Sequence, residues 1–183
     1  MEDIKKYLKH GEQTKPLDEV IEISKSIPGD GFDFVIGVMG WLDKNLKVER
    51  NRPDWNRLFN RRTASQIIED GFATGCTDVA LAFVALCRAK SIPTKYVEVI
   101  GKDWLGDQSG KGKIHGHTFA EIRLKNKWYV VDPDQKVIYA TGNPYRFFEI
   151  FGTGLDTWDV GLHSFEELRD KFLEFKKNRE PQK

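Results

Sequence analysis

The side chains best suited to nucleophilic chemistry in this chain are its two cysteines. Cys76 follows Gly75 at the start of a predicted helix, and Cys87 lies in the same apolar run, "CTDVALAFVALCRA". The first turn of a helix has unpaired N–H groups and a partial positive charge, which stabilise a thiolate or an oxyanion. We therefore interpret Cys76 as a candidate nucleophile and Cys87 as a core residue. The alternative for Cys76 is a small apolar residue at a helix end.

The spacing of the two cysteines excludes a disulfide within this helix. Cys76 and Cys87 are 11 residues apart, which corresponds to about 16 Å of helical rise. A disulfide needs Cα atoms within about 7 Å of each other. Both thiols are therefore expected to be free, as in a reducing compartment.

A thiolate nucleophile usually works with a base and with a group that orients the base. His117 opens the predicted strand "HTFAEIRL", which "KN" joins to a second predicted strand, "KWYVVD". If "KN" is a two-residue turn, His117 and Asp132 become diagonal neighbours on one face of the hairpin, about 7–8 Å apart at Cα. The sequence thus predicts an imidazole beside a carboxylate that can hold it.

This pairing depends on the turn, and each residue has a structural alternative. A four-residue turn keeps the two side chains on one face, and a three-residue turn separates them. His117 could be a strand-end histidine bonded to backbone, and Asp132 a turn residue of "DPD". His115 shares the face but lies further from Asp132, in a glycine-rich loop over residues 101–116. His10 and His163 lie in polar surroundings and are interpreted as surface residues.

The order of predicted elements is helices, then an antiparallel sheet, then a helix, which makes an α+β domain. Helical periodicity and capping residues predict helices in "PLDEVIEISKSI", "FDFVIGVMGWLDKNL", "TASQIIED", residues 77–89 and "SFEELRDKFLEFKKN". Alternation and β-branched residues predict strands in "TKYVEVI", "HTFAEIRL", "KWYVVD" and "KVIYA". Residues 1–183 are predicted to form one domain, with an N-terminal helical part at 1–62, a core at about 63–140 and a C-terminal helical part at 141–183.

Composition excludes several classes of protein. The chain has 183 residues, 39% hydrophobic and 31% charged, which is typical of a soluble globular protein. A net charge of +1 provides no field for nucleic acid or an anionic membrane, so neither is expected as a partner. The N-terminus, "MEDIKKYLKHGEQ", is too charged for a signal peptide, and no apolar run approaches the roughly 20 residues of a membrane span. We expect a cytoplasmic protein, and nothing in the sequence indicates its oligomeric state.

Two segments combine these features and resemble a known family. "GCTDVALAFVALCRAKSIPTKYVEV" and "GHTFAEIRLKNKWYVVDP" resemble the core of the transglutaminase-like superfamily, with its Cys-x-Asp/Glu helix, "HxWxEV"-like strand and "WxxxDP" strand. The gaps of 41 residues from Cys76 to His117 and 15 from His117 to Asp132 suit that pattern. The resemblance covers roughly residues 63–135. Ser91 stands where the family has glycine, and Phe119 where it has tryptophan.

The resemblance implies a papain-like α+β fold, in which a cysteine helix packs on an antiparallel sheet. It also implies roles: Cys76 as nucleophile, His117 as base and Asp132 as the orienting acid. Family enzymes often use an upstream aromatic or glutamine side chain as an oxyanion donor, and the candidates here are Trp55, Trp41 and Gln66. The family includes protein crosslinkers, peptidases, deamidases, peptide N-glycanases and members without catalysis.

The predicted function is a cysteine-dependent enzyme that acts on amide or peptide bonds through a thioester, with a peptide or protein as substrate. Hydrolysis is favoured over crosslinking, because the polar loop at 101–116 offers no dry amine channel. The alternative is a non-catalytic transglutaminase-like module that binds a peptide or protein partner in the same cleft. A redox role lacks a resolving cysteine, and the spacing matches no zinc motif, so no cofactor or metal is expected.

The segment "ERNRPDWNRLFNRR" contains five arginines in 14 residues. Such a cluster usually forms a solvated, partly helical surface, and the alternative is a rim that recognises an anion.

Overall fold

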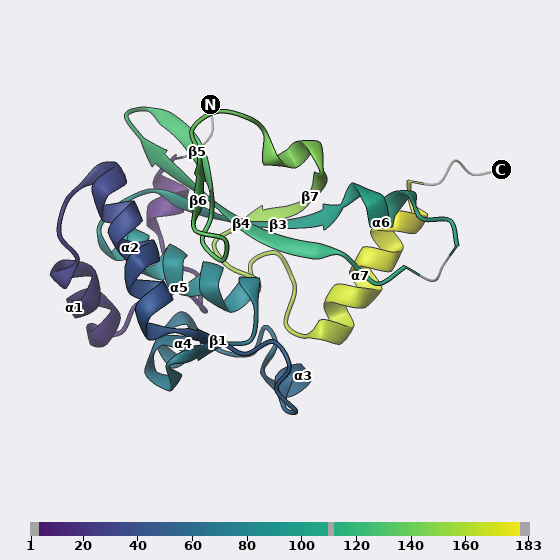
Figure 1. Cartoon of the computed structure of the whole chain (residues 1–183), viewed down its shortest axis with the longest axis horizontal. Helices are drawn as coiled ribbons and strands as arrows, with labels where there is room; N and C mark the ends of the chain where they lie inside the picture. The colour runs from purple at the N-terminus through teal and green to yellow at the C-terminus, as the bar shows by residue number, and fades with distance from the viewer. Residues whose placement is uncertain (1–3, 110–111, 180–183) are drawn as a thin grey trace.

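A five-stranded antiparallel sheet with the order β6-β5-β4-β3-β7 is the framework of the computed structural model (Figure 1). The structure describes residues 4–109 and 112–179. The strands are β3 (Thr94–Gly101), β4 (Gly116–Leu124), β5 (Lys127–Asp132), β6 (Val137–Tyr139) and β7 (Phe148–Gly154). Two-residue strands β1 (Lys47–Val48) and β2 (Phe72–Ala73) form a separate parallel pair.

The hairpin of β4 and β5 has the predicted two-residue turn. Leu124 pairs with Lys127, and Lys125 and Asn126 both have positive φ angles, of 48° and 63°. Two consecutive left-handed residues match the twist of the flanking strands, as in a type I′ turn. The register that follows from this turn places Ala120 opposite Val131, as the sequence predicts.

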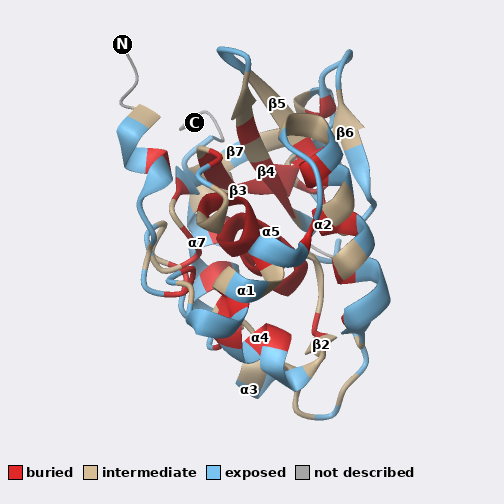
Figure 2. Ribbon diagram, turned by 90° about the vertical axis from the view of Figure 1, so that its left-hand side faces the viewer, coloured by how far each residue is buried: buried red, intermediate tan, exposed pale blue. Residues whose placement is uncertain are grey.

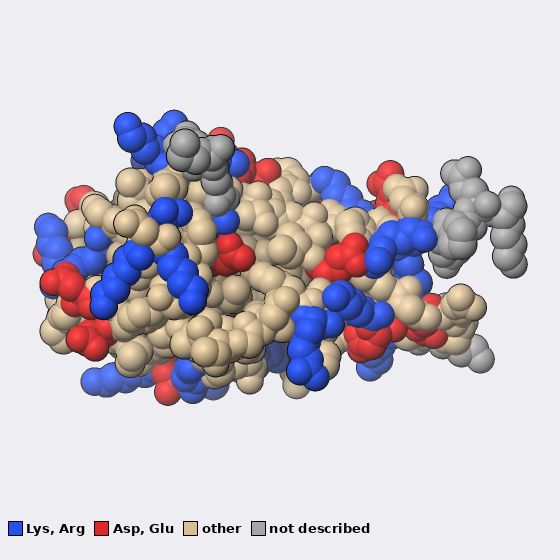
Figure 3. Space-filling model, turned by 90° about the horizontal axis from the view of Figure 1, so that it is seen from above, with Lys and Arg blue, Asp and Glu red and all other residues tan. Residues whose placement is uncertain are grey.

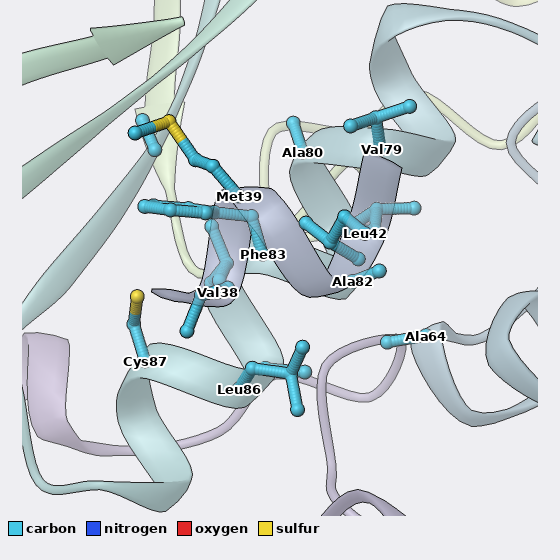
Figure 4. Close-up of a cluster of buried hydrophobic side chains, with 14 of the residues drawn as sticks. Val38, Met39, Leu42, Ala64, Val79, Ala80, Ala82, Phe83, Leu86 and Cys87 are labelled. Atoms are coloured by element: carbon cyan, nitrogen blue, oxygen red, sulfur yellow. The ribbon is translucent and has the colours of Figure 1, made fainter. Parts of the chain in front are cut away.

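Helices lie beneath one face of the sheet, and α5 (Cys76–Ala89) is the innermost of them (Figures 1 and 2). Residues 77–88 of α5 are all buried, and the helix contacts α1 (Asp18–Ser26), α2 (Gly31–Asn45) and α4 (Ala64–Asp70). Phe83 and Leu86 of α5 pack in this core with Val38 and Leu42 of α2 (Figure 4). The N-terminus of α5 is left at the edge of this layer, where the packing ends.

A second, smaller core joins the other end of the sheet to the C-terminal helix α7 (Phe165–Lys177) (Figure 1). Trp104 of the short helix α6 (Lys102–Gly106) is buried there against Phe172 of α7. The Lys176 ammonium also donates to the carbonyls of Trp104 and Asp107, at 2.6 Å each. The prediction of a loop over residues 101–116 is therefore wrong for α6, because this apolar packing outweighs the local glycine content. Residues 110–111 of that loop lie outside the described residues.

The remaining elements connect these layers. They are η1 (Ile4–Leu8), α3 (Trp55–Leu58) and η2 (Pro144–Arg146). In the described part of the chain, no helix is both long enough and apolar enough to span a bilayer. Acidic and basic side chains are interspersed on the face shown in Figure 3, without a large single-sign patch, as expected for a net charge of +1.

Candidate active site

Cys76 is the first residue of α5, and the loop before it is fixed by a buried carboxylate. Asp78 accepts hydrogen bonds from the backbone N–H and the hydroxyl of Thr74, both at 2.7 Å. Arg62 donates to the same carboxylate at 2.6 Å. These bonds hold the turn at Thr74 and Gly75, so that the half-buried Cys76 emerges at the helix end. Its thiol therefore lies beside N–H groups that have no acceptor within the helix.

His117 and Asp132 meet as the hairpin register predicts. The His117 Nε2 and an Asp132 carboxylate oxygen are 2.7 Å apart, with only 16% and 4% of the side chains exposed. The Cys76 thiol lies close enough to the His117 ring to raise the pKa of the imidazole. With Nε2 bonded to Asp132, Nδ1 is the ring nitrogen left for the thiol. The structure thus brings Cys76, His117 and Asp132 together, in the order thiol, imidazole, carboxylate.

The electrostatics of this group favour a charged imidazole. Burial by itself lowers the pKa of His117, but the Asp132 carboxylate, which accepts a hydrogen bond from Nε2, and the nearby Cys76 sulfur raise it to about 10. The ring also packs edge-on against Phe119, at 4.9 Å between centroids, and lies 5.9 Å from Phe148. An imidazolium held between a thiol and a carboxylate is the form that can protonate a leaving group.

Cys76 opens onto a pocket of about 280 Å³. Its walls come from α3, α5, β3, β4 and α7, and the lining side chains include Arg50, Trp55, Phe59, Glu98, Ile114, Phe165 and Leu168. The aromatic side chains form one group, since Trp55 lies 4.9 Å from both Phe59 and Phe165 between ring centroids. The pocket is therefore largely apolar, with one buried carboxyl group, that of Glu98.

The three candidate oxyanion donors occupy different places. Trp55 lines the pocket with Cys76, and its indole N–H donates to the Thr74 carbonyl at 3.2 Å. Trp41 packs against the main core. Gln66 is exposed and completes a capping box with Thr63 at the start of α4. The structure thus brings Trp55 to the pocket and leaves the other two outside its lining.

The other histidines have partners away from the thiol. His115 Nδ1 bonds to Asp103 at 2.8 Å, and His163 Nδ1 bonds to Glu167 at 2.9 Å. His115 therefore does not take the place of His117 beside Asp132. Among the described residues, no group of three histidine, cysteine, aspartate or glutamate side chains is arranged to hold a metal ion.

The arginine-rich segment divides into surface and buried residues. Arg52 bonds to Glu49 and Asp54 on the surface. Arg62, in contrast, is 5% exposed and bonds to Asp70 and Asp78. The interpretation of the whole segment as a solvated surface is therefore wrong for Arg62, which supports the loop before Cys76.

Comparison with protein families places these residues in context. The family model of the transglutaminase-like superfamily matches residues 22–133, more than half of the chain. The chain belongs to the transglutaminase-like superfamily. The match includes Cys76, His117 and Asp132. It begins within α1, well before the two segments that carry the resemblance in the sequence. It ends before β6, β7 and α7.

A solved structure has a similar fold. It is the crystal structure of a candidate cysteine protease from Cytophaga hutchinsonii, with a TM-score of 0.61 and 19% sequence identity. The alignment covers 88% of this chain and 50% of that protein, so this chain spans about half of its length. At this identity the likeness shows the fold alone. None of the curated proteins matches the chain significantly. Together these findings support a transglutaminase-like α+β fold of the papain-like kind.

Sequence reasoning missed several groups around this transglutaminase-like site. Glu98 of β3 bonds to Thr118, and Thr118 lies 3.3 Å from the Thr77 hydroxyl on α5. Phe165 and Leu168 of α7 also line the pocket, although they lie 89 and 92 residues after Cys76 in the sequence. A carboxylate within the apolar strand "TKYVEVI" was the one signal in the sequence that could have pointed to Glu98.

Proposed function

We propose that this protein is a cysteine-dependent hydrolase of amide or peptide bonds that works through a thioester on Cys76. The observation that carries the proposal is the His117 ring, which is held by the Asp132 carboxylate at 2.7 Å from Nε2 and lies close enough to the Cys76 thiol for the thiol to raise its pKa. Thiol, imidazole and carboxylate in this order are the groups that nucleophilic acyl transfer requires. The substrate is a peptide or protein that presents its carbonyl at the start of α5.

The first half of the reaction forms the thioester. The Cys76 thiolate adds to the amide carbonyl, and the C–N bond breaks as the His117 imidazolium gives its proton to the leaving amine. Asp132 accepts a hydrogen bond from Nε2 and keeps the ring oriented. The backbone N–H of Cys76, at the positive end of α5, is our choice for the first oxyanion donor. Trp55 is the candidate for the second, once its indole N–H leaves the Thr74 carbonyl.

The second half releases the acid. Neutral His117 takes a proton from a water molecule, whose oxygen attacks the thioester carbonyl. The C–S bond breaks, a carboxylic acid leaves, and the thiolate–imidazolium pair is restored. The proton that His117 gives to the amine in the first half is replaced by one from water in the second half. The cycle is therefore balanced without a cofactor.

Water is the acceptor that we favour over an amine. Efficient transfer to an amine needs a second site that binds the amine and excludes water from the thioester. The pocket beside Cys76 is about 280 Å³, which is just below the usual range of about 300–1,000 Å³ for small-molecule sites. We assign this pocket to the acyl side chain of the substrate and not to an amine. Water, being far more concentrated than any cellular amine, then wins by mass action.

The experiment that tests this proposal follows both products. A casein-like protein is offered with a fluorescent primary amine at millimolar concentration, and amine incorporation and free-acid formation are measured with wild-type protein and with Cys76→Ala. We expect release of amine or ammonia with little incorporation, and loss of both in the variant. Incorporation that exceeds free acid and depends on Cys76 would make the protein a transferase.

A further inference from the structure

Glu98 is a buried carboxyl group that the proposed mechanism does not use. It is 2% exposed and lines the same pocket as Cys76. The Tyr96 hydroxyl and the Thr118 hydroxyl both donate to its Oε2 oxygen, the latter at 3.3 Å. Among the described residues, none donates a hydrogen bond to Oε1. One oxygen of the carboxyl is therefore held by the sheet, and the other is available to a ligand in the pocket.

The charges around the pocket favour a cation. Glu98 and Cys76 line it, and the Asp132 carboxylate lies behind His117. The positive groups are the His117 imidazolium, which Asp132 already balances, and Arg50 at the rim. Arg50 is also neutralised, because its Nη2 bonds to both carboxylate oxygens of Asp134, at 2.7 and 2.6 Å. When Glu98 is ionised, the pocket thus carries an excess of negative charge, which a cationic ligand complements.

The walls are suited to an aliphatic stem that ends in this cation. Phe165 and Leu168 of α7 lie in the lining with Phe59 and Ile114. The rings of Trp55 and Phe165 are 4.9 Å apart and add aromatic faces, which attract cations. A long side chain that is apolar along its length and charged at its end would match both parts of this lining. Since the family match ends at residue 133, the α7 wall lies outside the matched core.

We infer that Glu98 is a specificity-determining residue, which binds the cationic end of a lysine-like side chain on the substrate's acyl residue. This inference rests on the proposed function, because it places the side chain next to the carbonyl that Cys76 attacks. Glu98 acts by binding, and it takes no part in the proton transfers. A carboxylate that gains an ammonium partner recovers the interactions lost through its burial.

The test uses matched electrophiles on the full chain. Peptide vinyl sulfones with lysine, norleucine or glutamate next to the electrophile are reacted with the protein, and labelling of Cys76 is timed by intact mass spectrometry. Norleucine keeps the aliphatic stem and removes the charge. At pH 8 we expect the lysine probe to label at least about tenfold faster than the norleucine probe, the scale of a hydrogen bond to a charged group.

Two further comparisons isolate Glu98. Glu98→Gln should bring the lysine-to-norleucine ratio close to one, whereas Glu22→Gln, an exposed change on α1, should leave the ratio as in wild type. In wild-type protein the ratio should also fall between pH 8 and pH 6. Burial raises the pKa of Glu98 to about 7, against its bonds from Tyr96 and Thr118 and the nearby charge of His117, which lower it. Any effect of pH on the nucleophile acts on both probes alike and cancels in the ratio.

The outcomes distinguish this inference from the proposed function. Labelling of Cys76 by all three probes at equal rates would overturn the role of Glu98 and leave the proposed function standing. Faster labelling by the glutamate probe would also overturn it and would assign recognition to Arg50. If no probe labels Cys76, the proposed function fails, and the inference fails with it. The wild-type pH series decides the question even if Glu98→Gln does not fold.

Discussion

Replacing Glu98 by glutamine should make the protein more stable at alkaline pH and should remove part of its pH dependence. Glutamine keeps the shape of the side chain and an oxygen that can accept from Tyr96 and Thr118. It removes the charge that the buried carboxyl carries once it ionises. The variant therefore isolates the cost of burying that charge from the cost of losing hydrogen bonds.

The magnitude follows from the pKa. Burial raises the pKa of Glu98 from 4.5 to about 7, over the opposing effects of Tyr96, Thr118 and His117. A carboxyl whose pKa is raised by folding stabilises the protein below the unfolded pKa and loses that contribution as pH rises through the folded pKa. The difference of about 2.5 corresponds to about 3 kcal/mol, lost by the wild type between pH 4 and pH 8. For a chain of this size that is about 6–12 °C in Tm.

The assay is urea or thermal unfolding of wild type, Glu98→Gln and the surface control Glu22→Gln at several pH values from 4 to 8. The free energy of unfolding of Glu98→Gln, relative to wild type, should rise by about 3 kcal/mol from pH 4 to pH 8. Glu22→Gln should parallel the wild type, because its side chain is 70% exposed. Two results would refute the reasoning. One is that the unfolding free energies of Glu98→Gln and wild type change in parallel with pH. The other is that the stability of Glu98→Gln relative to wild type falls from pH 4 to pH 8.

Three further predictions concern the two cysteines and the carboxylate behind the histidine. In the folded protein, iodoacetamide should alkylate Cys76 at least about 10³-fold faster than Cys87, which is fully buried and reacts only after unfolding; equal rates by mass spectrometry would contradict this. Cys87→Ser should lose about 1–3 kcal/mol of unfolding free energy, because a hydroxyl replaces a core thiol. Cys76→Ala should melt like wild type. If Cys76→Ala melted at a lower temperature than Cys87→Ser, Cys76 would be the core residue and Cys87 would not. Asp132→Asn should lower the pKa of His117 from about 10 and slow Cys76 labelling by peptide electrophiles; an unchanged histidine titration by NMR would remove Asp132 from the site.

The central hairpin could be predicted from sequence because its determinants are local. The two-residue turn at Lys125 and Asn126 fixes the register, and the register places His117 and Asp132 on one face. The position of Cys76 could be predicted for the same reason, since Gly75 and the apolar run after it mark a helix start. Bringing the helix to the hairpin required the family resemblance, because nothing local specifies that contact.

Other parts depend on contacts between distant segments. β7 pairs with β3 through residues more than 45 positions apart, and its glycines obscure the strand pattern. α6 forms in a glycine-rich stretch because Trp104 packs on Phe172, far along the chain. Such long-range packing overrides local propensity, which is all that a single sequence displays.

The burial of individual charged residues also could not be predicted from the sequence. All eight residues of β3 are buried, so both of its faces are covered and alternation cannot mark Glu98 as inward or outward. Arg62 belongs to a segment that is otherwise charged and exposed. Its own side chain is nevertheless buried, and it forms ion pairs with Asp70 and Asp78. A charged residue enters the interior only with such partners, and partners brought together by the fold are not visible in the sequence.

The central claim is that Cys76, activated by His117, attacks a substrate carbonyl. The most direct measurement is intact mass spectrometry with peptide mapping after a short incubation with a peptide aryl ester, quenched in acid to trap the acyl-enzyme. We predict one added acyl group per chain, located on Cys76, which is absent from Cys76→Ala and decays in water to free acid. A chain that stays unmodified, or an acyl group found on Cys87 or on lysines at the same rate in Cys76→Ala, would contradict the account.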